Sequence, residues 1–600
     1  MKKSSLLSSL CIGVMLTGCG LGIKNPDCYR FKTGKNFCNT KFKFERPKIP
    51  NFEKEFDDQA IELVTYQTTL IDFDFVKDQK VSINKGGTYL LKGKSTNCSV
   101  EINTNDVVNL IFDNLCLTSI GATPIEVKNA KELNIHVNSK TKNYICDSQS
   151  NDNKAAIYAS CPINIDGRGF LYLNSYGKNE DSIDYGKCIY TKNNLNIKDT
   201  RIIVQLSTGS TFEVEGDVNV ENAKIEVKFS VGGGLISNGN LRFYNSLFIF
   251  RGTMDAIEVN NFDALNSDFY IYTVGNYKKV NLETDSLDIN DSYYIKDDND
   301  FYRVDPTNYD YTKVLYKLSY STKGVLTHGE ANFINCRFNL DTDDDSISSV
   351  GNINSTNSHY FIKSSNQGVV SEGTLTFLNE SEKDDEFPIK IFESYVGLKG
   401  ELINFDGAST FVDSSNSGIE SFGEDGNITF KNNSKLIVDT DVFGLLTKGE
   451  VDIDHSFVSV FGGDSLNLPV IKNEVSINNN EGTLLLAENK NLPALVPEVK
   501  ENTISILLKD KIKKKDIIHL KSKNKRFFSS LIVPKAYENL MVTISSNLIS
   551  KDEYEISKGG LIDYRFVQDI SILNGLPQDD ELLSNIIFEK DLDNVYEELM

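Results

Sequence analysis

The chain has 600 residues, of which 25% are charged and 40% hydrophobic, a composition typical of a folded protein and not of a disordered one. Its formal net charge is −22 at pH 7, and such a field opposes nucleic acid and other polyanions unless a cation bridges them. We therefore expect no nucleic-acid partner.

The first 18 residues read as an export signal. Lys2 and Lys3 precede an apolar run that is too short to span a bilayer, and the segment ends in LTGC at Cys19. LTGC resembles the cleavage box of bacterial lipoproteins, which implies cleavage before Cys19 and a lipid on its thiol. The alternative is an ordinary secretory signal with a chance cysteine. We expect an exported protein that is lipid-anchored at the bacterial cell envelope and faces the cell surface.

A repeat follows. GVLTHGEANFINCRFNL (324–340) and GLLTKGEVDIDHSFVSV (444–460) share Gly, Leu-Thr and Gly-Glu at matching positions, followed by alternating apolar residues. Taking the second residue as an anchor, apolar residues recur at offsets +6, +8, +13 and +15. Anchors that fit without a gap are Ile189, Phe212, Leu235, Val325 and Leu445. A looser copy begins at Ile257, and the anchors 189, 212, 235 and 257 are 23, 23 and 22 residues apart.

This period predicts a parallel β-helix. Offsets of two indicate strand alternation, and Gly or Asn between the strands allows turns. A propeller blade needs about 40 residues, and the consensus of leucine-rich repeats is missing. We predict an all-β solenoid at 81–490 with an insertion at 276–323. A tether and N-terminal cap at 19–80, a small β domain at 498–566 and an acidic, helical or frayed tail at 567–600 complete the chain.

Several motifs carry a family resemblance between residues 80 and 565. They are GGTYLLKG (86–93), PIEVKNAKELNIHV (124–137), AAIYASCPINIDGRGFLYLNS (155–175), STKGVLTHGEANFINCRFNLDTDDDSISS (321–349) and KAYENLMVTISSNLISKDEYEISKGG (535–560). In this order they resemble a bacterial carbohydrate-binding β-helix family with pectate-lyase-like coils and a clostridial member that binds polygalacturonate and cellulose. The resemblance implies a right-handed parallel β-helix that holds calcium and binds acidic plant or cell-wall polysaccharide without established catalysis.

Acidic coil corners are the candidate calcium ligands. The family often carries Asp-Asp-Gly-Ile at these corners, and clustered carboxylates suit a hard cation. Here Asp343, Asp344, Asp345 and Asp255 keep such positions. Other corners are neutral, as at Asn366-Gln367. The alternative is a solvated acidic turn.

Two segments are candidate ligand-binding surfaces. The insertion is rich in aromatic residues, which stack on the apolar faces of sugar rings. The candidates are Tyr293, Tyr294, Tyr302, Tyr309 and Tyr311; the alternative is that they form the core of a side lobe. The lysine-rich segment 509–526 is the second candidate, with a solvated turn as its alternative.

The function we predict is non-catalytic polysaccharide binding, to an acidic glycan such as polygalacturonate or to cellulose. A structural or adhesion lipoprotein without glycan binding is the alternative. A lyase-like enzyme is less favoured, because no Lys or Arg recurs beside an acidic corner in a way that marks a base.

Overall fold

The computed structural model describes most of the chain after residue 67. The described residues are 68–147, 155–176, 185–282, 287–288, 291–297, 300–307, 309–310, 312–380, 388–462, 470–471, 475–489, 499–508, 511–514, 516–523, 528–549, 552–566, 573–588 and 594–599. Their regular elements are all strands, as predicted. The chain divides into unit 1, residues 1–330 with 340–344, and unit 2, residues 331–339 with 345–600.

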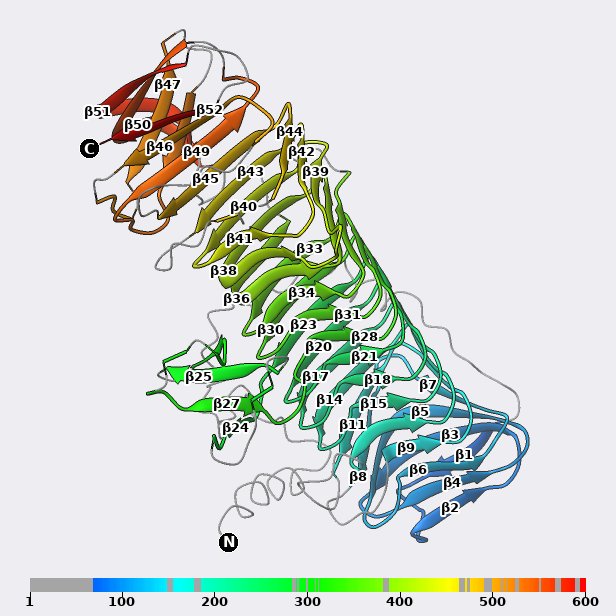
Figure 1. The fold of residues 1–600 in the computed structure, drawn as a ribbon. Coiled ribbons are helices and arrows are strands. Elements are labelled where there is room, and N and C mark those ends of the chain that lie inside the picture. The colour runs from blue at the N-terminus through cyan, green and yellow to red at the C-terminus, as the bar shows by residue number, and fades with distance from the viewer. Residues whose placement is uncertain are drawn as a thin grey trace. The chain divides into compact units, whose positions relative to one another are not determined.

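Unit 1 is a parallel β-helix-like solenoid in which each coil adds one strand to each of three ladders (Figure 1). Ladder 1 contains β2 (Lys80–Ile83), β4 (Ser99–Asn103), β6 (Ile125–Asn129), β9 (Ala155–Ala159), β12 (Lys187–Thr191), β15 (Phe212–Val214), β18 (Leu235–Ser237), β21 (Ile257–Val259) and β28 (Val325–Thr327). Ladder 2 contains the first half of β5 (Val107–Ser119), β7 (Glu132–Val137), β10 (Ile163–Asp166), β13 (Leu195–Lys198), β16 (Val218–Glu221), β19 (Leu241–Tyr244) and β22 (Phe262–Leu265). Ladder 3 contains the second half of β5, β8 (Lys142–Asp147), β11 (Phe170–Ser175), β14 (Arg201–Ser207), β17 (Lys224–Ser230), β20 (Leu247–Gly252) and β23 (Asp268–Thr273).

The predicted anchors fall in register on ladder 1. Ile189 pairs with Phe212, Phe212 with Leu235, and Leu235 with Ile257. Ile257 then pairs with Val325, although the insertion separates them in the chain. All five side chains are at most 1% exposed, and burying such a side chain contributes about 1.5–3 kcal/mol. The repeat is therefore confirmed as the buried column of the solenoid.

Asparagines shape the corners and one outer face of the coils. Asn222, Asn245 and Asn266 turn the chain between ladders 2 and 3 with φ of 49°, 48° and 50°, a left-handed conformation that Asn tolerates better than most residues. On the outer face of ladder 2, five other asparagines in successive coils form a hydrogen-bonded row. Each side-chain amide donates to the preceding Oδ1 at 2.7–2.9 Å, in the order Asn109, Asn134, Asn164, Asn196 and Asn219. The row satisfies polar groups in a half-buried position.

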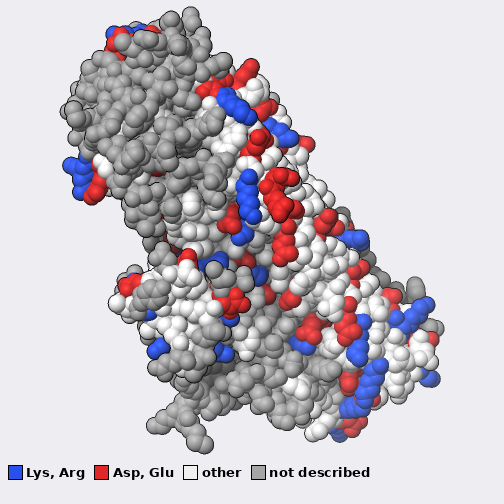
Figure 2. Space-filling model, viewed as in Figure 1, with Lys and Arg blue, Asp and Glu red and all other residues white. Residues whose placement is uncertain are grey.

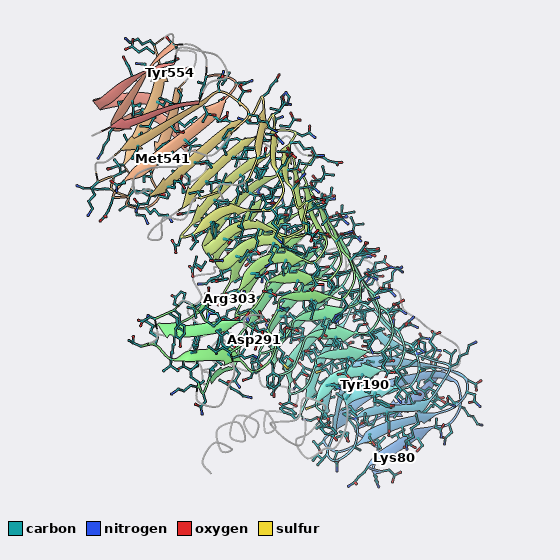
Figure 3. All side chains as sticks on the ribbon, viewed as in Figure 1. Lys80, Tyr190, Asp291, Arg303, Met541 and Tyr554 are labelled. Atoms are coloured by element: carbon teal, nitrogen blue, oxygen red, sulfur yellow. The ribbon has the colours of Figure 1, made fainter. Side chains whose placement is uncertain are left out.

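The start of the solenoid and the insertion complete unit 1. β1 (Thr68–Asp72) pairs with β3 (Gly87–Ser95), and β3 pairs with β5, so the solenoid begins inside the segment predicted to be a tether and cap. The insertion forms a separate antiparallel sheet of β24 (Tyr277–Lys279), β25 (Tyr293–Asp297), β26 (Asp300–Val304) and β27 (Leu315–Leu318). We call this sheet and its connections the lobe; Asp291 and Arg303 belong to it (Figure 3).

Unit 2 has the same three kinds of ladder. Ladder 1 contains β31 (Ile347–Ser349), β34 (Gln367–Ser371), the second halves of β36 (Ile389–Gly400) and β38 (Ser409–Ser421), and β41 (Phe443–Leu446). Ladder 2 contains β29 (Ala331–Ile334), β32 (Ile353–Thr356), β35 (Thr374–Leu378), β37 (Leu402–Asp406), β39 (Ile428–Lys431), β42 (Val451–Asp454) and β44 (Ile477–Asn480). Ladder 3 contains β33 (His359–Ser364), the first halves of β36 and β38, β40 (Lys435–Thr440), β43 (Phe457–Gly462) and β45 (Thr483–Asn489). β30 (Arg337–Thr342) contains residues of both units.

The C-terminal β domain closes unit 2. β45 pairs antiparallel with β49 (Leu540–Ser546), which pairs with β46 (Thr503–Leu508), and β46 pairs with β52 (Asn594–Leu599). A second sheet contains β48 (Phe528–Ile532), β47 (Ile517–Ser522), β50 (Asp552–Phe566) and β51 (Leu573–Phe588). The prediction of a helical or frayed tail after residue 567 is wrong, because β51 and β52 both gain backbone partners there.

Candidate functional site

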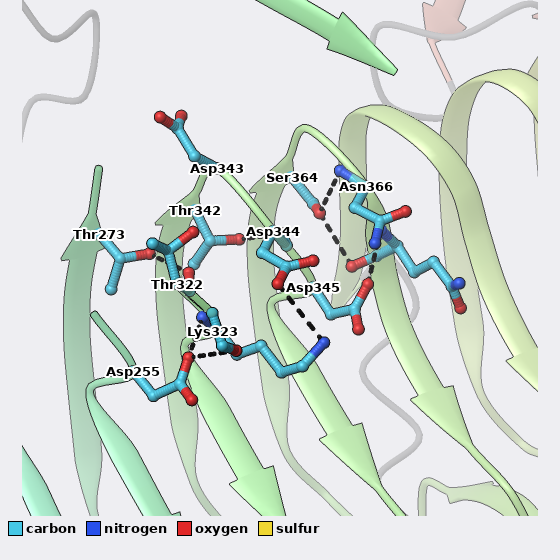
Figure 4. Close-up of polar contacts among 12 residues, drawn as sticks. Asp255, Thr273, Thr322, Lys323, Thr342, Asp343, Asp344, Asp345, Ser364 and Asn366 are labelled. Carbon is cyan, nitrogen blue, oxygen red and sulfur yellow. Dashed lines mark hydrogen bonds and ion pairs between the residues drawn. The ribbon is translucent and has the colours of Figure 1, made fainter. Parts of the chain in front are cut away.

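The acidic corner of unit 1 holds the two ends of the lobe (Figure 4). Asp255 Oδ1 accepts hydrogen bonds from the Ser321 hydroxyl at 2.7 Å and from the Lys323 backbone N–H at 2.6 Å. Asp343 Oδ2 accepts the Gly275 N–H at 2.9 Å. The Lys323 ammonium lies 3.6 Å from Asp344. These buried carboxylates therefore fix the points where the chain leaves the coil and returns.

This arrangement does not fit a shared calcium site. Calcium takes six to eight oxygen ligands, whereas three of the predicted ligands already accept donors of the protein and Lys323 places a positive charge beside Asp344. Asp345 accepts instead from the Gln367 N–H at 3.2 Å. Among the described residues, no group of three or more His, Cys, Asp or Glu side chains is placed to hold a metal ion. Calcium binding by these residues remains a prediction.

Burial also sets the charge state of Asp255. Its side chain is buried, which raises its pKa to about 6, although the bonds from Ser321 and Lys323 and the Lys323 charge lower it. The carboxylate is therefore ionised at neutral pH and becomes neutral in mild acid.

The lobe tyrosines are mostly core residues. Tyr293, Tyr294 and Tyr309 are 2%, 0% and 9% exposed, and Tyr293 and Tyr309 pack with Val280 and Leu315. A sugar cannot reach these rings, so the structure contradicts their assignment to carbohydrate binding. The physical reason is that a small separate sheet must build its own apolar core.

The two other predicted tyrosines differ. Tyr302 is 51% exposed and stays a candidate. Tyr311 lies outside the described residues, as does Cys19. Elsewhere in the lobe, Tyr277 stacks on Phe301 with ring centroids 3.7 Å apart, which uses a ring face that a sugar would need.

A positively charged surface lies on the outer side of ladder 3 in unit 1. We call it the basic face and define it by Lys142, Tyr144, Phe170, Tyr172, Arg201, Lys224, Glu226 and Lys228. It occupies alternate positions of β8, β11, β14 and β17, which pair in register. The charged residues at the outward positions of these four strands are four cations and the single anion Glu226.

Side-chain contacts order the basic face. Tyr144 and Tyr172 stack with centroids 4.6 Å apart and planes 10° apart, and the Arg201 guanidinium lies 4.9 Å from the Phe170 ring centroid. Both tyrosine rings are stacked along the ladder and only partly buried, so they offer hydroxyl groups and edges more than faces.

The lysines of this face keep part of their charge available. Lys224 and Lys228 are 31% and 28% exposed and both contact Glu226, Lys224 at 3.5 Å. Burial opposes ionisation of Glu226, but the two ammonium groups outweigh it and hold the pKa of that carboxyl below its usual range. One carboxylate cannot neutralise both lysines, and Lys142 adds a third positive charge to the same face, so the surface stays cationic.

The sequence alone does not reveal the basic face, because its charged residues lie one coil apart in the chain. Lys224 follows Arg201 by 23 residues, and the register places them side by side. Comparing equivalent positions of successive coils would have found them. The lysine-rich segment 509–526, in contrast, is partly neutralised locally, because Lys521 and Lys523 pair with Glu555 and Glu553 at 3.7 and 2.5 Å.

Comparison with known proteins points to carbohydrate. A family model described as "Carbohydrate-binding domain-containing protein" matches residues 77–368. No curated protein and no solved structure gives a significant match. The matched part contains the basic face and the lobe. The described part of the chain has no helix long and apolar enough to cross a membrane.

Proposed function

We propose that this chain is an exported lipoprotein that carries a lipid on Cys19, faces outward from the bacterial cell envelope and binds an acidic polysaccharide on its basic face without cleaving it. The observation that carries the proposal is three lysines, Lys142, Lys224 and Lys228, against one anion at the outward positions of neighbouring strands, inside the segment similar to carbohydrate-binding proteins.

The chemistry of the basic face suits a uronic acid polymer. The lysine ammonium groups are donors to sugar carboxylates, and the Tyr144 and Tyr172 hydroxyls can bond sugar hydroxyls. The whole chain carries −22, and acidic and basic side chains are interspersed on the face seen in Figure 2. A local cationic surface is therefore what a polyanion needs to approach this protein. Parallel coils about 4.8 Å apart repeat the charges along the solenoid, as monomers repeat along a polymer.

Affinity electrophoresis through polygalacturonate tests this proposal on protein that lacks residues 1–19. We expect retardation that weakens with salt and falls at least about fivefold in Lys224→Gln/Lys228→Gln, since each lost ion pair to a partly buried site contributes about 1 kcal/mol. Lys198→Gln is the matched control, because Lys198 pairs with Glu221 at 3.0 Å on ladder 2, away from the basic face.

Three outcomes would contradict the proposal. They are no retardation of the wild type, equal retardation of the double variant and the wild type, or loss of retardation in the Lys198→Gln control. A chelator arm is included, and we expect binding to persist in it because lysines supply the positive charge. Failure to bind any glycan would favour the structural or adhesion alternative.

A further inference from the structure

A row of aromatic side chains runs across the outer side of ladder 3 in unit 2. Phe361 on β33, Phe392 on β36 and Phe411 on β38 follow one another, with ring centroids 5.1 and 5.5 Å apart and planes tilted by 51° and 52°. Phe361 is 41% exposed, and Phe392 and Phe411 are partly buried. The rings are tilted and not stacked on one another, unlike Tyr144 and Tyr172, and the 41% exposure of Phe361 leaves part of that side chain accessible.

The row is covered at the end where Phe411 lies. Phe411 packs against the buried cluster of the C-terminal β domain, which includes Ile437 and Phe461 of the same outer face. The apolar surface beyond Phe411 is thus covered, whereas Phe361 stands at the exposed end. Three rings at strand spacing extend about 10 Å, which is enough for a short segment of a sugar chain lying across the strands.

Polar groups border the row. Lys390 lies in register between Phe361 and Phe411. Lys363 pairs with Glu393 at 2.5 Å. Such groups provide donors and acceptors for sugar hydroxyls at the edges of a stacked ring.

A carboxylate pair lies beside the row. Asp413 of β38 is in register with Asp439 of β40, and the Lys535 ammonium lies 3.0 Å from Asp439 and 3.3 Å from Asp441. Burial and the charges of Asp439, Glu393 and Asp441 raise the pKa of Asp413 to about 6, against the opposing charge of Lys535.

The charges around the row nearly cancel. The cations are Lys363, Lys390, Lys435 and Lys535, and the anions are Glu393, Asp439 and Asp441, with Asp413 adding a fourth negative charge above about pH 6. The surface therefore has no positive excess to attract a polyanion, and Asp413 would repel one. A neutral chain meets no such repulsion.

We propose that the Phe361–Phe392–Phe411 row, bordered by Lys390 and Asp413, is a second glycan site that binds a neutral polysaccharide by stacking, separate from the basic face. The site rests on the proposed function only in that the chain binds polysaccharide. Its ligand class and its residues are different, and Phe392 and Phe411 lie outside the segment matched by the family model.

Affinity electrophoresis of the 20–600 protein through hydroxyethylcellulose and through xylan tests this site, with polygalacturonate in parallel. We expect at least one neutral polymer to retard the wild type. Phe361→Ala should weaken this retardation at least about fivefold, since a ring stacked on a sugar contributes on the order of 1 kcal/mol or more. Phe361→Tyr should retain most of it, and both variants should bind polygalacturonate as the wild type does, which also reports that they fold.

The two proposals can fail separately. Lys224→Gln/Lys228→Gln should leave neutral-glycan retardation unchanged, so its loss there would overturn the idea of a separate site. The inference is also overturned if neither neutral polymer retards the wild type, or if Phe361→Ala migrates like the wild type in them. Retardation by a neutral polymer without polygalacturonate binding would sink the basic-face proposal and leave this one standing.

Discussion

Gly444 is the first residue of the repeated stretch GLLTKGEVDIDHSFVSV, and we expect that adding a single methyl group there, as in Gly444→Ala, destabilises the fold. Its φ is not in the left-handed region, so the cost of Gly444→Ala arises from contact alone. A Cβ there would lie 1.8 Å from Val460 Cγ1 and 2.9 Å from Val470 Cγ1. Carbon atoms in contact lie at about 3.5–4.0 Å, and valine is stiff and fully buried here.

The structure gives magnitudes for a double-mutant cycle. Over-packing costs about 1–3 kcal/mol, and we expect the upper end for Gly444→Ala. Val460→Ala removes two buried methyl groups and leaves a cavity, for about 2–3 kcal/mol. In the double variant the methyl group added at position 444 occupies the space that Val460 Cγ1 leaves, so we expect a cost of only about 1–2 kcal/mol. The interaction free energy would then be about −4 kcal/mol.

Native-state hydrogen exchange provides a local measurement, which a long solenoid requires because its unfolding need not be two-state. The Gly444 and Leu445 amides donate to Val470 O at 2.8 and 3.2 Å, so their protection reports this coil. Gly444→Ala/Val458→Ala is the control, because Val458 is also buried but is not among the atoms nearest Gly444. The control should be additive. Additivity within about 0.5 kcal/mol in the Val460 cycle would refute the reasoning.

Three further predictions concern charge and hydrogen bonding. The folded pKa of Asp255 is raised from 3.8 to about 6, so its charged form opposes folding. Protection of the Lys323 amide, corrected for intrinsic exchange, should therefore fall as pH rises from about 4 to about 6. Asp255→Asn should abolish this slope, because the Asn Oδ1 can keep both hydrogen bonds. The folded pKa of Asp413 is raised in the same way, so its charged form opposes folding, and protection of the Asp441 amide, which donates to Ser414 O in this coil, should fall as pH rises from about 4 to about 6 in the wild type and not in Asp413→Asn; equal slopes in the two proteins would contradict this. Asn164→Leu removes the donor to Asn134 Oδ1 and the acceptor of the next amide, and should lower the local opening free energy of this coil by about 1–2 kcal/mol in native-state hydrogen exchange; unchanged protection would show that the row is not stabilising.

The architecture could be predicted from sequence because hydrophobic burial imposes a period. The anchors Phe212 and Leu235 are both inward and in register because a parallel coil repeats its buried positions, and the insertion was visible as a break in that period. Side-chain direction within the insertion was not predictable in the same way. Aromatic content alone does not distinguish Tyr294, which is fully buried, from Tyr302, which is half exposed.

The candidate sites were harder to predict because they depend on neighbours a coil apart. Asp343 looked like a metal ligand from its acidic surroundings in the chain, but its carboxylate accepts a hydrogen bond from Gly275 N–H, 68 residues earlier. Lys224 and Arg201 are separated by a whole coil, so no local charge run marks the basic face. Phe361 and Phe392 are likewise brought together only by the register of β33 and β36.

The antiparallel pairing of β45 with β49 has a consequence for self-assembly. A parallel ladder ends in a row of unpaired N–H and C=O groups that could template another copy of the chain. β49 runs against the ladder and covers β45 from Thr483 to Asn489, and the buried cluster of the C-terminal domain includes Leu485 and Ala487 of β45. The C-terminal domain therefore prevents a further strand from pairing with β45 at the end of the solenoid. A protein cut before residue 499 should associate end to end into fibres, whereas the full chain stops growing at this coil.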